Sequence, residues 1–157
     1  MEKKMGFFEA VSQVIRKSFV FKGRARRKEF WSWTLFSALL NVAVTVAVMM
    51  MSSSETVQTC VSLLLALLMF FPGLSVAVRR LHDVERSGWW LGGYYIALVV
   101  YALFALMLAA GGCAKALLIF SIVLLIVALC WAIVMLVWNF TEGTNGPNEY
   151  GEDPKRD

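Results

Sequence analysis

The sequence predicts an all-α membrane protein with four transmembrane helices in an antiparallel bundle, preceded by an N-terminal amphipathic interfacial helix. Three observations support this fold class. Hydrophobic side chains make up 59% of the 157 residues, with a mean hydropathy of +0.67, whereas soluble domains average roughly 45–50% apolar residues. The apolar residues form four blocks of about 20 residues, the length that crosses a bilayer core. Nearly all cations lie outside these blocks, on one side.

The first predicted element is an interfacial helix over residues 5–22. Its apolar side chains recur at helical intervals and its polar side chains fall on the opposite face. The apolar positions are Phe7, Phe8, Val11, Val14, Ile15 and Phe19. Such a helix lies in the membrane surface with its basic residues near anionic headgroups. Packing of the same face against the protein's own cytoplasmic loops explains the pattern equally well. Gly23 is expected to end the helix.

Four spans follow, each without a Lys, Arg, Asp, Glu or His residue: 30–51, 57–78, 89–110 and 116–138. Short connections between them predict antiparallel neighbours in a single membrane domain, residues 1–157. Tryptophans mark the entrances of the first and third spans, where amphipathic rings favour the headgroup level. The predicted interface anchors are Trp31, Trp33, Trp89 and Trp90.

The cations predict the orientation in the membrane. Fourteen of the fifteen Lys and Arg residues fall on one side of the predicted spans, and Lys115 alone falls on the other. Because Lys and Arg near span ends are retained in the cytoplasm, both termini are expected to be cytoplasmic. The net charge of +4 is therefore an orientation signal, and no nucleic-acid partner is expected.

The residues after the last span form a cytoplasmic tail, 139–157, with five acids and two cations after Trp138. Asn-Gly and Gly-Pro steps predict successive turns. We expect the tail to fold back over the basic face, although a frayed terminus is the common alternative. Cys60 and Cys113 fall near the outer face and could pair, but three free thiols are favoured because cysteine is also an ordinary apolar filler.

The stretch "RRLHDVERSGWW", residues 79–90, holds the only histidine of the chain. Arg79 and Arg80 lie at a span end among several carboxylates, so internal ion pairing is the favoured interpretation. The sharper hypothesis keeps the same residues and adds a ligand, because arginine forks suit phosphate and His82 can donate or titrate beside them. The residues proposed for an anionic ligand or partner are Arg24, Arg27, Arg79, Arg80, His82 and Asp83.

Three motifs occur in this order: "FKGRARRKEFWSW" (21–33), "AVRRLHDVERSGWW" (77–90) and "EGTNGPNEYGEDP" (142–154). Together they resemble the YhaH-type family of small bacterial inner-membrane proteins, a domain family of unknown function. The resemblance covers nearly the whole chain and implies a multi-span bacterial inner-membrane protein, with no catalytic residues to carry over. In the tail, the matching positions include Gly146, Pro147, Asn148, Tyr150 and Gly151. The three motifs together are called the cap, and they are expected to form one composite cytoplasmic surface.

Three function classes remain open from the sequence. The first is a noncatalytic interaction or lipid-binding protein, whose partners are the bilayer, anionic phospholipid headgroups, another protein or a second copy. The second is a small oligomeric transporter or channel, and the third is a lipid-modifying enzyme that uses the Arg and His cluster. We favour the first class, because His82 next to Asp83 is a thin basis for catalysis. No cofactor and no metal site are expected, since a single histidine is poor ligation.

Overall fold

Five helices make up most of the chain in the computed structural model, which describes residues 5–52, 54–110 and 115–155. A short helix comes first, and the four that follow are long and apolar enough to cross a membrane. These residues contain no β-strand. The predicted fold class is therefore confirmed. The helices are α1 (Phe7–Arg16), α2 (Arg27–Met51), α3 (Glu55–Asp83), α4 (Trp89–Ala109) and α5 (Lys115–Phe140).

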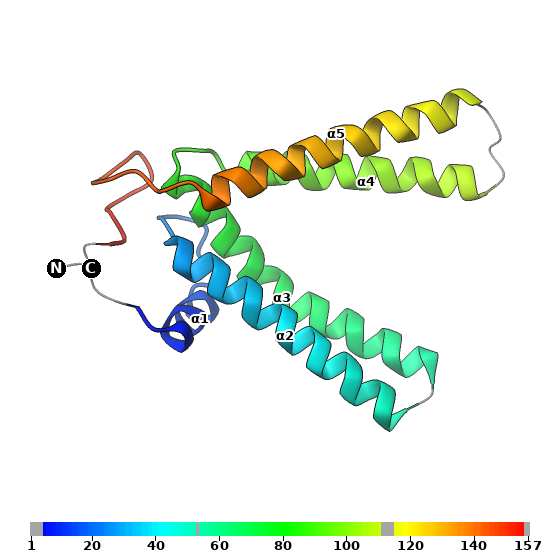
Figure 1. The fold of residues 1–157 in the computed structure, drawn as a ribbon, viewed down its shortest axis with the longest axis horizontal. Coiled ribbons are helices and arrows are strands. Elements are labelled where there is room, and N and C mark those ends of the chain that lie inside the picture. Colours follow the sequence, from blue (N-terminus) through cyan, green and yellow to red (C-terminus); the bar gives the residue numbers. More distant parts are fainter. Residues whose placement is uncertain (1–4, 53, 111–114, 156–157) are drawn as a thin grey trace.

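The four long helices form two antiparallel hairpins, α2 with α3 and α4 with α5 (Figure 1). The hairpins meet at the end where α1 and the tail lie, and they diverge toward the other end (Figure 1). Helix α5 contacts both α2 and α3. The cap therefore lies where the two hairpins are joined.

Helix α3 continues five residues beyond the predicted end of its span at Val78, so the first part of the second motif is helical and not a loop. Arg80 and Asp83 pair across one turn of the helix, and this pairing stabilises the extension. The helix ends where Glu85 adopts a positive φ of 57°. The buried charged residues Arg79, Arg80 and Asp83 therefore lie at the end of α3.

Helix α1 is shorter than the predicted segment 5–22, because the chain turns away after Arg16. The Ser75 hydroxyl of α3 lies 2.6 Å from the carbonyl oxygen of Lys17 and 2.7 Å from that of Val20, so it fixes the turn. Gly23, with a φ of 85°, lies beyond the helix end and makes the entry into α2.

The apolar side of α1 is divided between the protein and its surroundings. Val11 and Val14 are buried in a cluster with Ala25, Trp33 and Val76. α1 thus packs on the spans themselves as well as on the loop before α2, which differs from a helix held only by the membrane surface. Phe7 is partly buried against this cluster, whereas Phe8 and Ile15 stay exposed, at 80% and 51%.

The prediction that Trp33 is an interface anchor is wrong, because Trp33 is only 4% exposed and packs inside the cluster between α1, α2 and α3. Trp89 is 82% exposed at the start of α4, as an anchor position requires. Gly93 of α4 allows a close approach, since a Cβ there would lie 2.8 Å from the Trp131 ring. The pairing of Cys60 with Cys113 stays open, because Cys113 lies outside the described residues.

Trp33→Ala should destabilise the protein much more than Trp89→Ala. Removing the buried Trp33 ring leaves a cavity and is expected to lower the free energy of unfolding by about 3–5 kcal/mol. The Trp89 ring is 82% exposed, so its removal serves as the matched control. Denaturant unfolding of both variants in detergent micelles measures the difference, and equal losses would contradict the buried position of Trp33.

Candidate functional site: the cap

The centre of the cap is the carboxylate of Asp83, which binds one arginine from each side. Arg24 donates from Nε to Asp83 Oδ1 at 2.9 Å, and Arg80 donates from Nη1 to Asp83 Oδ2. All three side chains are buried. Two guanidinium groups, one from the first motif and one from the second, therefore share a single carboxylate away from solvent.

Glu29 makes a second buried ion pair and also caps a helix. Its Oε2 accepts from Arg79 Nη1 at 3.3 Å, and its Oε1 accepts from the backbone N–H of Arg26 at 3.1 Å. Glu29 stands in the first turn of α2, where a negative charge is favoured by the helix dipole. The start of α2 is thereby tied to the end of α3. These contacts confirm the predicted internal ion pairing of Arg79 and Arg80.

The tail is held against both other motifs, as predicted. Arg24 donates from Nη1 to the Gly146 carbonyl at 2.6 Å and from Nη2 to that of Thr144. Arg80 donates to the carbonyl of Thr141, and the Thr144 N–H donates to the Asp83 carbonyl at 2.9 Å. The buried arginines thus bind backbone carbonyls of the tail in addition to their carboxylates.

His82 completes the junction by contacting the first and third motifs. Its ring stacks on the Tyr150 ring with centroids 4.1 Å apart and planes 6° from parallel. Nδ1 lies 3.1 Å from the Gly23 carbonyl oxygen, which can only accept, so Nδ1 carries a proton. Asn148 donates to the His82 carbonyl at 3.0 Å. His82 is therefore a structural contact between motifs in this arrangement.

The glycines of the third motif are explained by the path of the tail. A Cβ on Gly143 would lie 1.9 Å from Asp83 Oδ2, so only glycine fits there. Gly146 and Gly151 have positive φ values of 81° and 139°. Asn148 and Gly151 exchange backbone hydrogen bonds, which closes a tight turn. Pro147 lies on the exposed side of this segment.

Two members of the cap differ from the expectation in opposite ways. Arg27 pairs with Glu142 at the surface, with 41% and 74% of their side chains exposed, so this pair contributes little. Asp153, which the sequence did not single out, is 6% exposed and accepts from the backbone N–H groups of Gly146 and Lys155. These bonds lower the pKa of Asp153. An Asp shortly after a glycine turn is the only sequence signal for this role.

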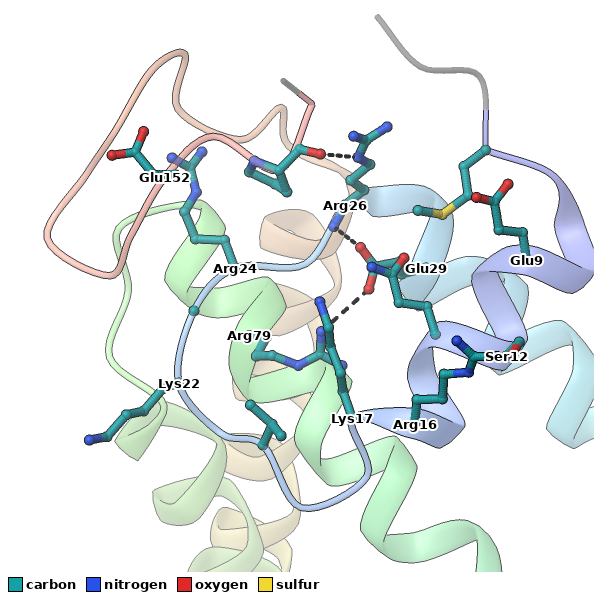
Figure 2. Close-up of a pocket in the computed structure, with 15 residues that line it drawn as sticks. Glu9, Ser12, Arg16, Lys17, Lys22, Arg24, Arg26, Glu29, Arg79 and Glu152 are labelled. Atoms are coloured by element: carbon teal, nitrogen blue, oxygen red, sulfur yellow. Dashed lines mark hydrogen bonds and ion pairs between the residues drawn. The ribbon is translucent and has the colours of Figure 1, made fainter. Parts of the chain in front are cut away.

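A cavity of about 630 Å³, the cap cavity, lies between α1, the loop before α2 and the tail (Figure 2). Among the described residues, six cations and three carboxylates line it, so positive charge dominates. The cations are Arg16, Lys17, Lys22, Arg24, Arg26 and Arg79. The sequence predicted that Arg16, Lys17 and Lys22 contribute to orientation and to attraction toward anionic headgroups, but not that they line one cavity. The turns between α1 and α2 place these three residues around the cap cavity.

The cap arginines are arranged so that one of them has an unused edge. Arg79 is 1% exposed, and its only hydrogen bond in the described part of the chain joins Nη1 to Glu29. Its Nε and Nη2 atoms have no partner there. These two nitrogens carry parallel N–H bonds, the pair that binds a carboxylate or phosphate side-on. The predicted anion-binding role of the cap stays a prediction.

Asp83→Asn should release the tail and destabilise the protein. Losing the shared carboxylate leaves Arg24 and Arg80 as buried charges, which costs about 3–5 kcal/mol. Glu142→Gln removes a carboxylate from the exposed pair and should cost about 1 kcal/mol or less. Thermal unfolding and limited proteolysis after residue 140 compare the two variants. A tail that stays equally protected in both would contradict the role of Asp83.

Comparison with known proteins identifies the family of the chain. Residues 18–152 match a family described as "Protein of unknown function (DUF805)". Inner membrane protein YhaI of Escherichia coli K12 is 35% identical over 90% of this chain and 92% of its own length. Inner membrane protein YhaH of the same strain is 28% identical, over 91% and 93%. No solved structure matches significantly. With four candidate spans and a family match over nearly its whole length, the chain belongs to the DUF805 family of membrane proteins.

Proposed function

We propose that the chain is a noncatalytic membrane protein whose cap binds the headgroup of an anionic phospholipid. The observation that carries the proposal is the unused Nε and Nη2 edge of Arg79 at the cap cavity. A buried donor without an acceptor costs about 1–3 kcal/mol, and more when it is charged. An anion that supplies two acceptor oxygens removes this cost, which favours its binding.

The surroundings of Arg79 fit a phosphate. Arg16, Lys17 and Lys22 line the same cavity as Arg79 (Figure 2). The Arg79 edge is buried, so neighbouring side chains of the cavity must move for a phosphate oxygen to reach it, and we expect Lys17 to be a second cationic contact. Arginine binds phosphate through two parallel N–H bonds and lysine binds it as a point charge.

The position of the cavity fits a lipid source for that phosphate. Phe19, in the turn after α1, has its ring 5.2 Å from the ring of Phe71, which lies within the α3 span. Phe8 and Phe19 are 80% and 73% exposed, which suits side chains inserted at a membrane surface. Lys17 and Lys22 flank this apolar turn. The cavity mouth is therefore expected at headgroup level.

The same proposal includes a cytoplasmic position of the cap and a noncatalytic role for the protein. The distribution of cations supports a cytoplasmic cap, with both termini on that side. An enzyme using the Arg and His cluster needs His82 and Asp83 to act on one substrate. Instead, His82 Nδ1 faces the Gly23 carbonyl, and Asp83 faces Arg24 and Arg80. Both groups serve the fold, which supports binding over chemistry.

Phosphatidylmethanol should be retained by the purified protein in preference to phosphatidylcholine. The first lipid is anionic and its headgroup has no N–H or O–H donor, so the comparison isolates charge. Exchanging Arg16, Lys17 and Lys22 together for Gln should lower the preference at least tenfold, since each cation near a lipid surface contributes about 1 kcal/mol. Native mass spectrometry of protein from mixed-lipid nanodiscs measures the ratio.

A matched triple exchange of Lys28, Arg86 and Lys155 for Gln makes the same change in net charge outside the cavity lining and should leave the preference nearly intact. Arg79→Lys keeps the charge opposite Glu29 and loses the fork, so it should weaken the preference while the protein stays folded. Equal effects of the two triple exchanges, or no preference in the wild type, would refute a lipid site in the cap cavity.

A further inference from the structure

A second cavity, the hairpin groove, lies at the junction of the two hairpins and is lined by α2, α3, α4 and α5. Its volume is about 450 Å³, in the usual range for ligand pockets. Most of its lining is apolar. The polar lining residues are Thr34, Ser37, Tyr94, Tyr95 and Asn139. The groove shares no lining residue with the cap cavity, so the inference drawn from it does not rest on the proposed headgroup site.

Asn139 carries the one buried side-chain atom of the described groove lining that lacks a partner. The residue is 8% exposed, and its Nδ2 donates to the Met135 carbonyl at 2.8 Å. That bond fixes the amide orientation, because the opposite orientation would place two oxygens together. Its Oδ1 has no donor among the residues that the structure describes. By contrast, the hydroxyls of Thr34 and Ser37 donate to the carbonyls of Phe30 and Thr34.

The groove begins at the headgroup boundary and descends into the hydrocarbon. Asn139 stands next to the end of α5 at Phe140, whose ring lies 4.4 Å from that of Trp31. Aromatic rings of this kind mark the membrane interface. From Asn139 to Ala132, the deepest α5 residue of the lining, the groove descends about 10 Å at 1.5 Å per residue. This depth is about a third of a bilayer core.

We infer that the hairpin groove holds a phospholipid of the leaflet on the cap side, with the upper part of one acyl chain between the hairpins and a headgroup donor bonded to Asn139 Oδ1. The donor is an ammonium N–H or a hydroxyl. The groove is lined by all four long helices, and the hairpins diverge away from the end where they meet (Figure 1). A lipid whose acyl chain lies in the groove brings its headgroup donor to the level of Asn139, where the groove begins.

The dimensions favour a lipid chain over a helix from a second copy of the protein. A transmembrane helix packs along much of a span of about 30 Å and is about 10 Å wide. The lining of the groove covers little more than one turn of α4, from Leu91 to Tyr95, and about two turns of α2, from Phe30 to Ser37. A short, narrow space of this kind fits a hydrocarbon chain.

The test uses the full-length protein in nanodiscs made from equal amounts of phosphatidylethanolamine and phosphatidylcholine. Both lipids are zwitterionic, so the cap cavity does not distinguish them, and only the first has N–H donors. Mild detergent extraction followed by mass spectrometry should find phosphatidylethanolamine enriched about fivefold on the wild type. This factor corresponds to about 1 kcal/mol for a single hydrogen bond.

Asn139→Leu keeps the side-chain volume and removes the acceptor, so the enrichment should fall to about onefold. Ala77→Phe fills the groove from α3 and should abolish the enrichment by excluding the chain, which provides a second route if Asn139→Leu does not fold. Ala38→Phe adds the same ring at an exposed position of α2 outside the lining and should behave as the wild type.

Three outcomes would overturn the inference. The first is equal retention of the two lipids by the wild type. The second is an enrichment that survives Asn139→Leu or Ala77→Phe. The third is a dimer that Ala77→Phe dissociates while bound lipid is unchanged, which would assign the groove to a second copy. Loss of the phosphatidylmethanol preference without any change in this enrichment would affect the cap cavity alone.

Discussion

The fold depends on one buried carboxylate that holds two buried guanidinium groups. Asp83 binds Arg24 and Arg80, and both arginines continue to backbone carbonyls of the tail. Burying charge is favourable only when partners and hydrogen bonds replace the lost water. Each motif supplies some of these partners. Displacing any one motif would therefore leave a buried charge in the others without a partner. This requirement explains why the three motifs of the cap are held together.

The membrane explains why such a polar junction is needed. Between apolar helices in lipid there is no hydrophobic driving force, because lipid tails are as apolar as the side chains. The two hairpins meet where the cap begins, and they diverge along spans that carry no charged side chain (Figure 1). The buried apolar clusters also lie toward this end, around Trp33 and around Leu81. Polar contacts therefore fix how the hairpins meet, and the two cavities lie beside that junction.

The sequence predicted the spans and the meeting of the motifs, because block hydropathy and cation placement are strong, local signals. It also predicted ion pairs for Arg79 and Arg80 with neighbouring acids, although it did not single out Glu29 and Asp83 from the other acids nearby. It did not predict the end of α1, which depends on Ser75 contacting two carbonyls far away in sequence. Nor did it predict the burial of Trp33 or the unpartnered oxygen of Asn139. These features follow from tertiary packing, which one-dimensional periodicity does not contain.

Amide hydrogen exchange of the tail in native-lipid nanodiscs tests the central account most directly. The Thr144 N–H is bonded to the Asp83 carbonyl, and the N–H groups of Gly146, Asn148 and Gly151 are also bonded. The account predicts that residues 141–153 exchange far more slowly than an unstructured peptide, at rates comparable to the cap-side end of α3. Exchange of this segment at the rate of a free peptide would contradict it.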